Sequence, residues 1–277
     1  KQQLIYLDYN ATTPIHKEVQ KVMLPFLDEN FGNASSSHPL GFCSAKALLH
    51  SREQANKALG GEQGDEILFL SGATEANNYA LKGTIFRWIF EEKETNPIHL
   101  VISAFEHPAI THVAEWLEGC FAPQVKLSKV NVNTTSILAK DVLHVMKNES
   151  PPNCRRCLIS IMMANNETGS VQDIAKISQA VRSSVHSLCE LVFHTDASQA
   201  FGKIPLRASS LGVDFLTIAG HKCYAPKGVG ALWISKDAPK LTSLLHGGGQ
   251  ENGRRAGTEN IAYCVGLAKA MQLASDN

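Results

Sequence analysis

Short apolar runs recur along the chain and alternate with longer stretches in which apolar and polar residues mix. Each run has the length of a buried strand and is rich in Ile, Leu, Val and Phe. The runs occupy residues 66–70, 99–105, 124–130, 157–164, 191–197, 215–219 and 230–235. Because strands that are buried on both faces form continuous apolar runs, this pattern predicts an α/β fold with a mostly parallel sheet covered on both faces.

The segments between the runs have the composition and the end signals of helices. Residues 40–59 carry spaced apolar side chains and are followed by Gly60 and Gly61, which favour a helix end. Further helices are predicted at 74–91, 108–118, 139–147 and 172–187. Since no low-complexity linker or repeat divides the chain, we expect one large domain.

The charges of the chain are balanced. Its 277 residues include 26 Lys and Arg and 26 Asp and Glu, without a block of like charge. This balance argues against a nucleic acid or a membrane surface as the main partner. Residues 1–30 contain no apolar run behind a basic start, and no later segment reaches the roughly 18 uninterrupted apolar residues of a membrane span. We therefore expect a soluble chain whose partner is a small molecule or another protein.

Seven cysteines are scattered through the sequence. This usage is typical of free thiols in a reducing compartment, so we expect the cytosol, or the mitochondrial matrix if a targeting segment has been removed. Cys154 and Cys157 form a C-x-x-C pair without a second pair or a nearby His-x-His motif. We therefore expect no metal site. A redox role for this pair stays open, because two arginines separate the cysteines and would lower a thiol pKa.

The residues that directly follow the apolar runs are the first candidates for a site, because ligands of open α/β sheets bind beyond the carboxyl ends of the strands. After the first run the chain passes Ser71 and Gly72 and enters a predicted helix at Thr74. The N–H groups of such a helix start can bind a phosphate. Plain capping by Thr74 and Glu75 accounts for the same residues.

Polar groups also follow the later runs. His107 comes just before Pro108, where it is either a helix cap or a catalytic group. Asn165 and Asn166 can bind a ligand or build an Asx turn. Asp196 follows an apolar stretch, and a partly buried carboxylate there needs a partner, for which a cationic nitrogen of a ligand is suited.

Lys222 follows the apolar run at 215–219, which is an unusual place for a strongly hydrated ammonium group. In a desolvated site the pKa of a lysine falls, and its free amine can then attack a carbonyl group. Pyridoxal phosphate would use Lys222 for its aldehyde, Asp196 for its ring nitrogen and the helix start at Thr74 for its phosphate. A scaffold in which all of these residues are caps and turns would leave Lys222 and Asp196 unexplained together.

Eight ordered blocks of the sequence resemble those of the pyridoxal-phosphate-dependent cysteine desulfurases and selenocysteine lyases of aminotransferase class V. The blocks are YLDYNATTP (6–14), FGNASSSH (31–38), SGATEANN (71–78), EHPAI (106–110), ANNETG (164–169), HTDASQAFGK (194–203), GHKCYAPKGVGAL (220–232) and GGGQENGRRAGTEN (247–260). The resemblance implies a three-layer α/β/α fold with a mainly parallel central sheet, as in the large domain of fold-type I enzymes. We expect an N-terminal arm at 1–15 and the cofactor-binding large domain at 16–277.

The resemblance also implies roles for individual residues. Lys222 matches the lysine that binds the cofactor aldehyde, Asp196 the partner of the ring nitrogen, and His107 the residue that stacks on the ring and shuttles protons. The expected contacts of the phenolic oxygen are Asn166 and Gln199. The expected phosphate-binding residues are Ala73, Thr74 and His221, together with Thr258, which would reach the phosphate of the neighbouring subunit in a homodimer.

The implied activity is cleavage of the Cβ–Se bond of L-selenocysteine or the Cβ–S bond of L-cysteine, giving L-alanine and selenium or sulfur for an acceptor protein. The blocks ANNETG and GGGQE...GTEN, and Ala219 in place of a frequent serine, look more like the selenocysteine lyase branch. Family members continue beyond the position of Asn277 into a small domain with a mobile-loop cysteine and a carboxylate-binding arginine. The alternative expectation is therefore a truncated, catalytically impaired homologue that binds the cofactor and acts as a partner or regulator.

Overall fold

The computed structural model describes residues 5–131, 136–184 and 189–276. Within these residues, seven strands form one sheet in the order β1-β7-β6-β5-β4-β2-β3. Strands β2 to β6 pair in parallel, whereas β7 runs antiparallel to β1 and β6. The strand bounds are β1 Glu66–Leu70, β2 Ile98–Ser103, β3 Val125–Val130, β4 Arg156–Ser160, β5 Glu190–Asp196, β6 Phe215–Ala219 and β7 Gly230–Ile234.

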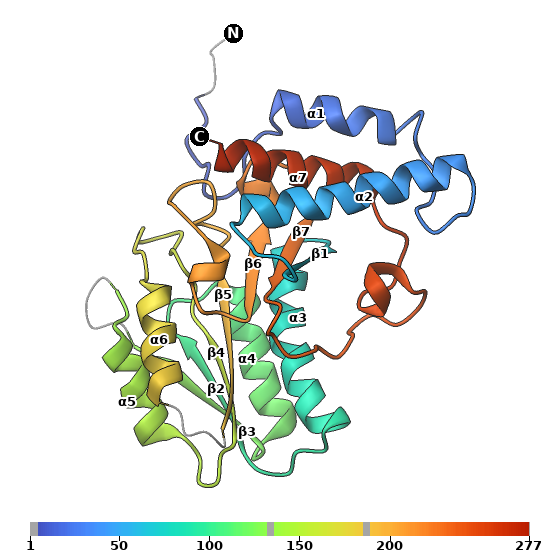
Figure 1. Cartoon of the computed structure of the whole chain (residues 1–277). Coiled ribbons are helices and arrows are strands. Elements are labelled where there is room, and N and C mark those ends of the chain that lie inside the picture. Colours follow the sequence, from blue (N-terminus) through green and yellow to red (C-terminus); the bar gives the residue numbers. More distant parts are fainter. Residues whose placement is uncertain (1–4, 132–135, 185–188, 277) are drawn as a thin grey trace.

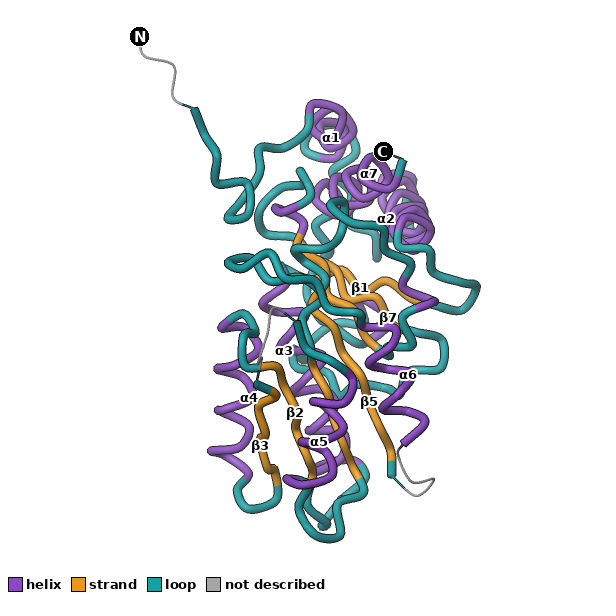
Figure 2. Tube along the Cα trace, turned by 90° about the vertical axis from the view of Figure 1, so that its left-hand side faces the viewer, coloured by secondary structure: helices purple, strands orange, loops and turns teal. Residues whose placement is uncertain are grey.

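Helices cover both faces of this sheet (Figures 1 and 2). Helices α3 and α4 form the core on one face, and α2, α5, α6 and α7 form it on the other, which confirms the predicted three-layer α/β/α fold. None of the described helices is both long and apolar enough to cross a lipid bilayer. The helix bounds are α1 Lys17–Met23, α2 Pro39–Ala58, α3 Ala73–Phe86, α4 Pro108–Phe121, α5 Ala139–Glu149, α6 Ile174–Ser184 and α7 Ile261–Ser275.

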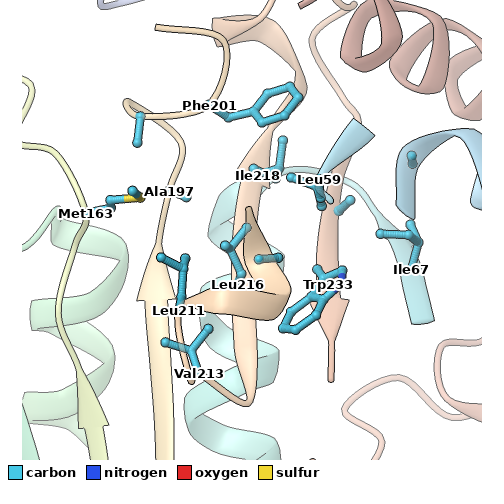
Figure 3. Packing of buried hydrophobic residues seen from close by; sticks show 14 of the residues in the cluster. Leu59, Ile67, Met163, Ala197, Phe201, Leu211, Val213, Leu216, Ile218 and Trp233 are labelled. Atoms are coloured by element: carbon cyan, nitrogen blue, oxygen red, sulfur yellow. The ribbon is translucent and has the colours of Figure 1, made fainter. Parts of the chain in front are cut away.

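The two cores follow from the alternation of side chains along each strand. In β6, Leu216 and Ile218 belong to the core beneath α2 and α7, whereas Phe215 faces α3 and α4. Figure 3 shows the first of these cores, where Leu216 and Ile218 lie near Leu59 of the α2 end and Trp233 of β7. Burial on both faces explains why the strands other than the edge strand β3 form nearly continuous apolar runs.

All seven apolar runs contain a strand, and β1 and β6 have the predicted bounds. The runs 99–105 and 157–164 were predicted too long, because residues 104–105 and 161–164 leave the sheet and form loops at its carboxyl end. Phe105 and residues 161–164 are apolar because they remain half-buried or buried under the site, whereas Ala104 is exposed. The predicted strand lengths are wrong at these two ends.

The predicted helices are confirmed with changed bounds, whereas α1 and α7 were missed. The predicted helix at 74–91 ends as an α-helix at Phe86 and continues as a π-helical turn over Arg87–Glu91. The final residues 185–187 of the predicted helix at 172–187 lie outside the described residues. Figure 1 shows α1, α2 and α7 grouped at one end of the molecule.

The N-terminal segment packs over the turn that follows β6. Thr13 donates both its backbone N–H and its hydroxyl to the carbonyl oxygen of His221, each at 2.9 Å. The backbone N–H of His16 donates to the carbonyl oxygen of Tyr224 at 3.0 Å. The boundary between an arm at 1–15 and a domain at 16–277 stays a prediction.

Candidate active site

A pocket of about 600 Å³ lies where the ends of β1, β2, β4, β5 and β6 meet the start of α3. This is the carboxyl end of the parallel strands, where the sequence predicted a ligand site. The predicted site residues that line the pocket are Ala73, Thr74, His107, Asn166, Asp196, Gln199, His221 and Lys222.

Lys222 ends the 3₁₀ turn Gly220–Lys222, which directly follows β6. Its side chain is half-buried, and no hydrogen bond or ion pair of its Nζ is found among the described residues. Burial lowers the pKa of Lys222, and the nearby charge of Asp196 opposes that shift. A larger fraction of the amine is therefore unprotonated and able to attack a carbonyl group.

Asp196 ends β5 and is only 4% exposed. Its Oδ1 accepts a hydrogen bond from the backbone N–H of Ser198 at 2.9 Å, and its Oδ2 accepts one from Asn77 Nδ2 at 2.8 Å. The hydroxyl oxygen of Ser198 is buried and has no hydrogen-bond partner within the described chain. A buried carboxylate that is held only by neutral donors is suited to a cationic group of a ligand.

His107 is both the cap of a helix and part of the pocket. Its Nδ1 accepts a hydrogen bond from the backbone N–H of Ala109 at 3.1 Å, so the ring caps α4. Burial lowers the pKa of His107, although Asp196 opposes the shift. In the neutral ring the proton is therefore on Nε2, which remains available to a ligand. The two roles considered for His107 from the sequence are thus compatible.

The start of α3 provides an anion site without a capping side chain. Gly72 occupies the cap position and makes no side-chain cap, and a Cβ at Gly72 would meet no atom within 4 Å. Glu75 instead accepts from the backbone N–H of Ser71 at 2.6 Å and pairs with Arg255 at 2.9 Å. The first N–H groups of α3, at Ala73 and Thr74, have no partner within the helix, and both residues line the pocket.

The N-terminal segment forms another wall of the pocket. Gln199 Nε2 donates to the carbonyl oxygen of Asn10 at 3.0 Å, and Lys203 donates to Gln199 Oε1. Asn10 Nδ2 reaches the carbonyl oxygen of Asn166 at 3.4 Å. Asn165, in contrast, builds an Asx turn, because its Oδ1 accepts from the backbone N–H groups of residues 167 and 168. The neighbouring amides at 165 and 166 therefore have different roles.

Two residues that contribute to this region were not predicted. Asn77 follows Thr74 by one helical turn, and this i, i+3 spacing was the available signal. Glu106 is buried beside His107 and accepts from the backbone N–H of Met162 at 2.6 Å, and burial raises the pKa of Glu106 to about 8. Thr258 is exposed and lies outside the pocket of its own chain, so its contact with a neighbouring subunit stays a prediction. In the described residues, no group of three or more metal-ligating side chains comes together.

Residues 5–277 match the aminotransferase class-V family. The chain belongs to this family. A cysteine desulfurase IscS of Methanosarcina thermophila is 41% identical over 272 residues, which cover 98% of this chain and 62% of the relative. A selenocysteine lyase of Xenopus tropicalis is 39% identical over 97% of this chain and 64% of the relative. This class V chain thus spans less than two thirds of these curated relatives.

Solved structures of the family have the same fold. A NifS-like protein is 32% identical and superimposes with a TM-score of 0.86 over 99% of this chain and 70% of its own. The structure named "SspA in complex with cysteine" is 35% identical and superimposes with a TM-score of 0.84, over 97% and 72% of the two chains. Relatives named as desulfurase and as selenocysteine lyase have similar identities, so the branch of this class V chain stays a prediction.

The pocket fits pyridoxal phosphate, the cofactor of this class V family. The cofactor needs a reactive amine, an anionic group for its ring nitrogen and donors for its phosphate. Lys222, Asp196 and the uncapped start of α3 provide these three groups around one cavity. The unpartnered hydroxyl of Ser198 and the open space at Gly72 are further features expected of a site that is completed by a ligand.

Proposed function

We propose that this chain carries the cofactor pocket of a pyridoxal-phosphate-dependent enzyme that cleaves the Cβ–S bond of L-cysteine or the Cβ–Se bond of L-selenocysteine. The products would be L-alanine and sulfur or selenium. The observation that supports this most strongly is the unpaired, half-buried amine of Lys222, which shares one cavity with the buried carboxylate of Asp196. The names of the relatives support the substrate class.

Three residues would carry the chemistry. When bound, pyridoxal phosphate takes up the substrate's amino group and withdraws electrons from its α-carbon. Lys222 would hold the aldehyde carbon through Nζ until the substrate's amino group displaces it, and the amine released in this way would accept the substrate's α-proton at Nζ. Asp196 binds the ring nitrogen and keeps a proton on it. His107 contacts the ring and holds or moves a proton at Nε2, since its Nδ1 is occupied by the α4 cap.

The remaining residues would hold and orient the cofactor. Ala73 and Thr74 bind the phosphate through the N–H groups at the start of α3, and His221 binds it from the turn after β6. Asn166 and Gln199 approach the phenolic oxygen. Gln199 is suited to donate there, because its carbonyl oxygen already accepts from Lys203.

The protein is proposed to act as a homodimer in which Thr258 reaches the phosphate of the neighbouring subunit. The exposure of Thr258 outside its own pocket is compatible with such a contact. A protein that accepts sulfur or selenium is the proposed partner. The seven free cysteines of the chain support a reducing compartment, for which we propose the cytosol, with the mitochondrial matrix as the other candidate.

The test is to load the purified chain with pyridoxal phosphate and to measure alanine formation from L-cysteine and from L-selenocysteine. The proposal predicts alanine from at least one of them, and the faster substrate identifies the branch. A chain that binds the cofactor in this pocket but forms no alanine from either substrate would contradict the proposed activity. That result would favour the impaired homologue, for which the comparisons give no support.

A further inference from the structure

Asn77 is a fully buried polar residue next to the proposed ring-nitrogen partner. It lies on α3, one turn after Thr74, and its side chain is 0% exposed. Its Nδ2 donates to Asp196 Oδ2 at 2.8 Å, and it also lines the pocket. Its Oδ1 is buried and has no hydrogen-bond partner within the described chain. The amide therefore makes one strong contact in this region, and that contact is to Asp196.

Asp196 depends on very few donors. Within the described residues its carboxylate accepts from Asn77 and from the backbone N–H of Ser198, and it forms no ion pair. A carboxylate that is 4% exposed and forms no ion pair relies on such donors for its hydrogen bonds and its orientation. Only one of the two donors is a side chain, so only one depends on residue identity.

The titratable groups around Asp196 do not replace this donor. Lys222 and His107 interact with its charge from the turn after β6 and from the start of α4. His194 and Glu106 interact with it from β5 and from the loop after β2. His194 is occupied by the hydroxyls of Ser160 and Thr217, and Glu106 is itself an acid. The Asn77 amide is therefore the side-chain donor that holds the Asp196 carboxylate at short range.

We propose that Asn77 is a positioning residue for the cofactor ring: its hydrogen bond to Oδ2 of Asp196 fixes the direction of that carboxylate toward the ring nitrogen. This inference rests on the proposed function and adds a residue to it. The start of α3 binds the phosphate and its second turn orients Asp196, so one helix sets both the phosphate end and the nitrogen end of the cofactor. A purely structural role, in which Asn77 ties α3 to β5, is the competing explanation.

The two explanations differ in what they predict for a cofactor analogue without the ring nitrogen. The test compares the affinity for pyridoxal phosphate with that for an analogue in which a ring C–H replaces the nitrogen, both measured by absorbance titration. The variant is Asn77→Leu, which has a similar volume and no donor. Its matched control is Asn78→Leu on the same helix, because Asn78 donates to the carbonyl oxygen of Thr74 and does not contact Asp196.

We expect Asn77→Leu to weaken binding of pyridoxal phosphate by about tenfold, which is the effect of one hydrogen bond to a charged group. Binding of the carbon analogue should stay within about twofold, because that ring has no nitrogen for Asp196 to recognise. Asn78→Leu should leave the ratio of the two affinities as in the wild type. Equal weakening of both ligands by Asn77→Leu, or no weakening of either, would overturn the proposal.

Two further measurements keep these outcomes separate. Circular dichroism and thermal unfolding show whether Asn77→Leu folds. If it does not, Asn77→Ala removes the donor without adding bulk, and the same ratio of affinities, for pyridoxal phosphate over the carbon analogue, is measured on that variant. If the wild-type chain binds neither ligand, the proposed function itself fails, because both ligands carry the phosphate and the aldehyde. A wild-type chain that binds both ligands, with an unchanged ratio in the folded Asn77 variant, contradicts only the role of Asn77.

Discussion

At the amino end of the central sheet, a cluster of partly buried charges is paired, whereas two charged residues at its carboxyl end, Lys222 and Asp196, are not paired within the described residues. Arg87, beside the start of the sheet, pairs with Glu92 and with Glu190 at the start of β5. Arg156, at the start of β4, binds Glu92 at 2.8 Å and Glu94 at 3.2 Å, and it also pairs with Glu190. Both guanidinium groups lie over the ring of Trp88.

Lys222 and Asp196 lie at the opposite end of the sheet. Their burial is comparable to or deeper than that of Arg87 and Arg156, but neither forms an ion pair within the described residues. The amine has no partner, and the carboxylate has only two neutral donors. Desolvating a charge without a counter-charge costs free energy that a ligand can recover. The comparison teaches that unpaired burial, and not charge as such, distinguishes the candidate active site from a stabilising cluster.

The largest effect is expected for Lys222→Met. This change should abolish attachment of the cofactor and lower the rate of alanine formation by at least about a thousandfold, because the reactive amine is gone. The protein should be no less stable than the wild type, since the removed amine forms no hydrogen bond or ion pair with the described residues. Thermal unfolding without cofactor, together with absorbance of the loaded protein, checks both parts. A large loss of stability would show that Lys222 is structural.

The pH dependence of stability at Glu106 tests the burial of ionisable groups at the carboxyl end of the sheet. Burial raises the pKa of Glu106 to about 8 from its usual 4.5, so between these values the folded chain holds a proton that the unfolded chain releases. Stability should therefore fall as pH rises through this window, and Glu106→Gln should remove about 3 kcal/mol of that pH dependence. Urea unfolding between pH 5 and pH 8 measures it. Parallel stability profiles of the variant and the wild type would contradict the burial of an uncharged Glu106.

Arg156→Met tests the amino end. Removing this guanidinium leaves three carboxylates, Glu92, Glu94 and Glu190, close together without their shared partner. We expect a loss of about 2 kcal/mol in the free energy of unfolding, with the affinity for pyridoxal phosphate unchanged. Urea unfolding and cofactor titration measure the two quantities. If Arg156→Met weakened the affinity for pyridoxal phosphate and left the free energy of unfolding unchanged, the amino end would not be a stabilising cluster that is separate from the site.

The smallest effect is expected for Lys129→Met, a matched control for Arg156. Lys129 pairs with Glu115 at 2.7 Å, but both side chains are more than a third exposed. Such surface pairs contribute little, so the free energy of unfolding should change by less than about 0.5 kcal/mol. If this variant lost as much stability as Arg156→Met, burial would not explain the stability of the amino-end cluster.

Most strands could be predicted because they are buried on both faces and form continuous apolar runs, whereas the edge strand β3 alternates and exposes Lys126 and Lys129. The helices α1 and α7 were harder to predict. Helix α1 has only seven residues, and its buried residues are Val19 and Met23. Helix α7 is apolar over much of its circumference, since it packs between α2 and α1, so its residues show no clear amphipathic period.

The site could be predicted where a residue lies at the end of a strand, as Asp196 does, or within a few residues after one, as His107 and Lys222 do. Asn77 and Glu106 escaped prediction for a different reason. Asn77 acts through a tertiary contact from α3 to β5, and Glu106 through its depth between two loops. Neither the partner of a buried side chain nor its degree of burial is encoded in local spacing. The selection of Asn166 over Asn165 came only from the resemblance, because the Asx turn of Asn165 is not visible in the sequence.

The central claim is that Lys222 is the amine of the pocket that binds a carbonyl cofactor. The most direct measurement is to load the wild-type chain with pyridoxal phosphate, reduce it with borohydride and locate the modified lysine by peptide mass spectrometry. The account predicts modification at Lys222 at one cofactor per chain. Modification spread over exposed lysines, or concentrated at the neighbouring Lys227 or Lys203 with Lys222 unmodified, would contradict it.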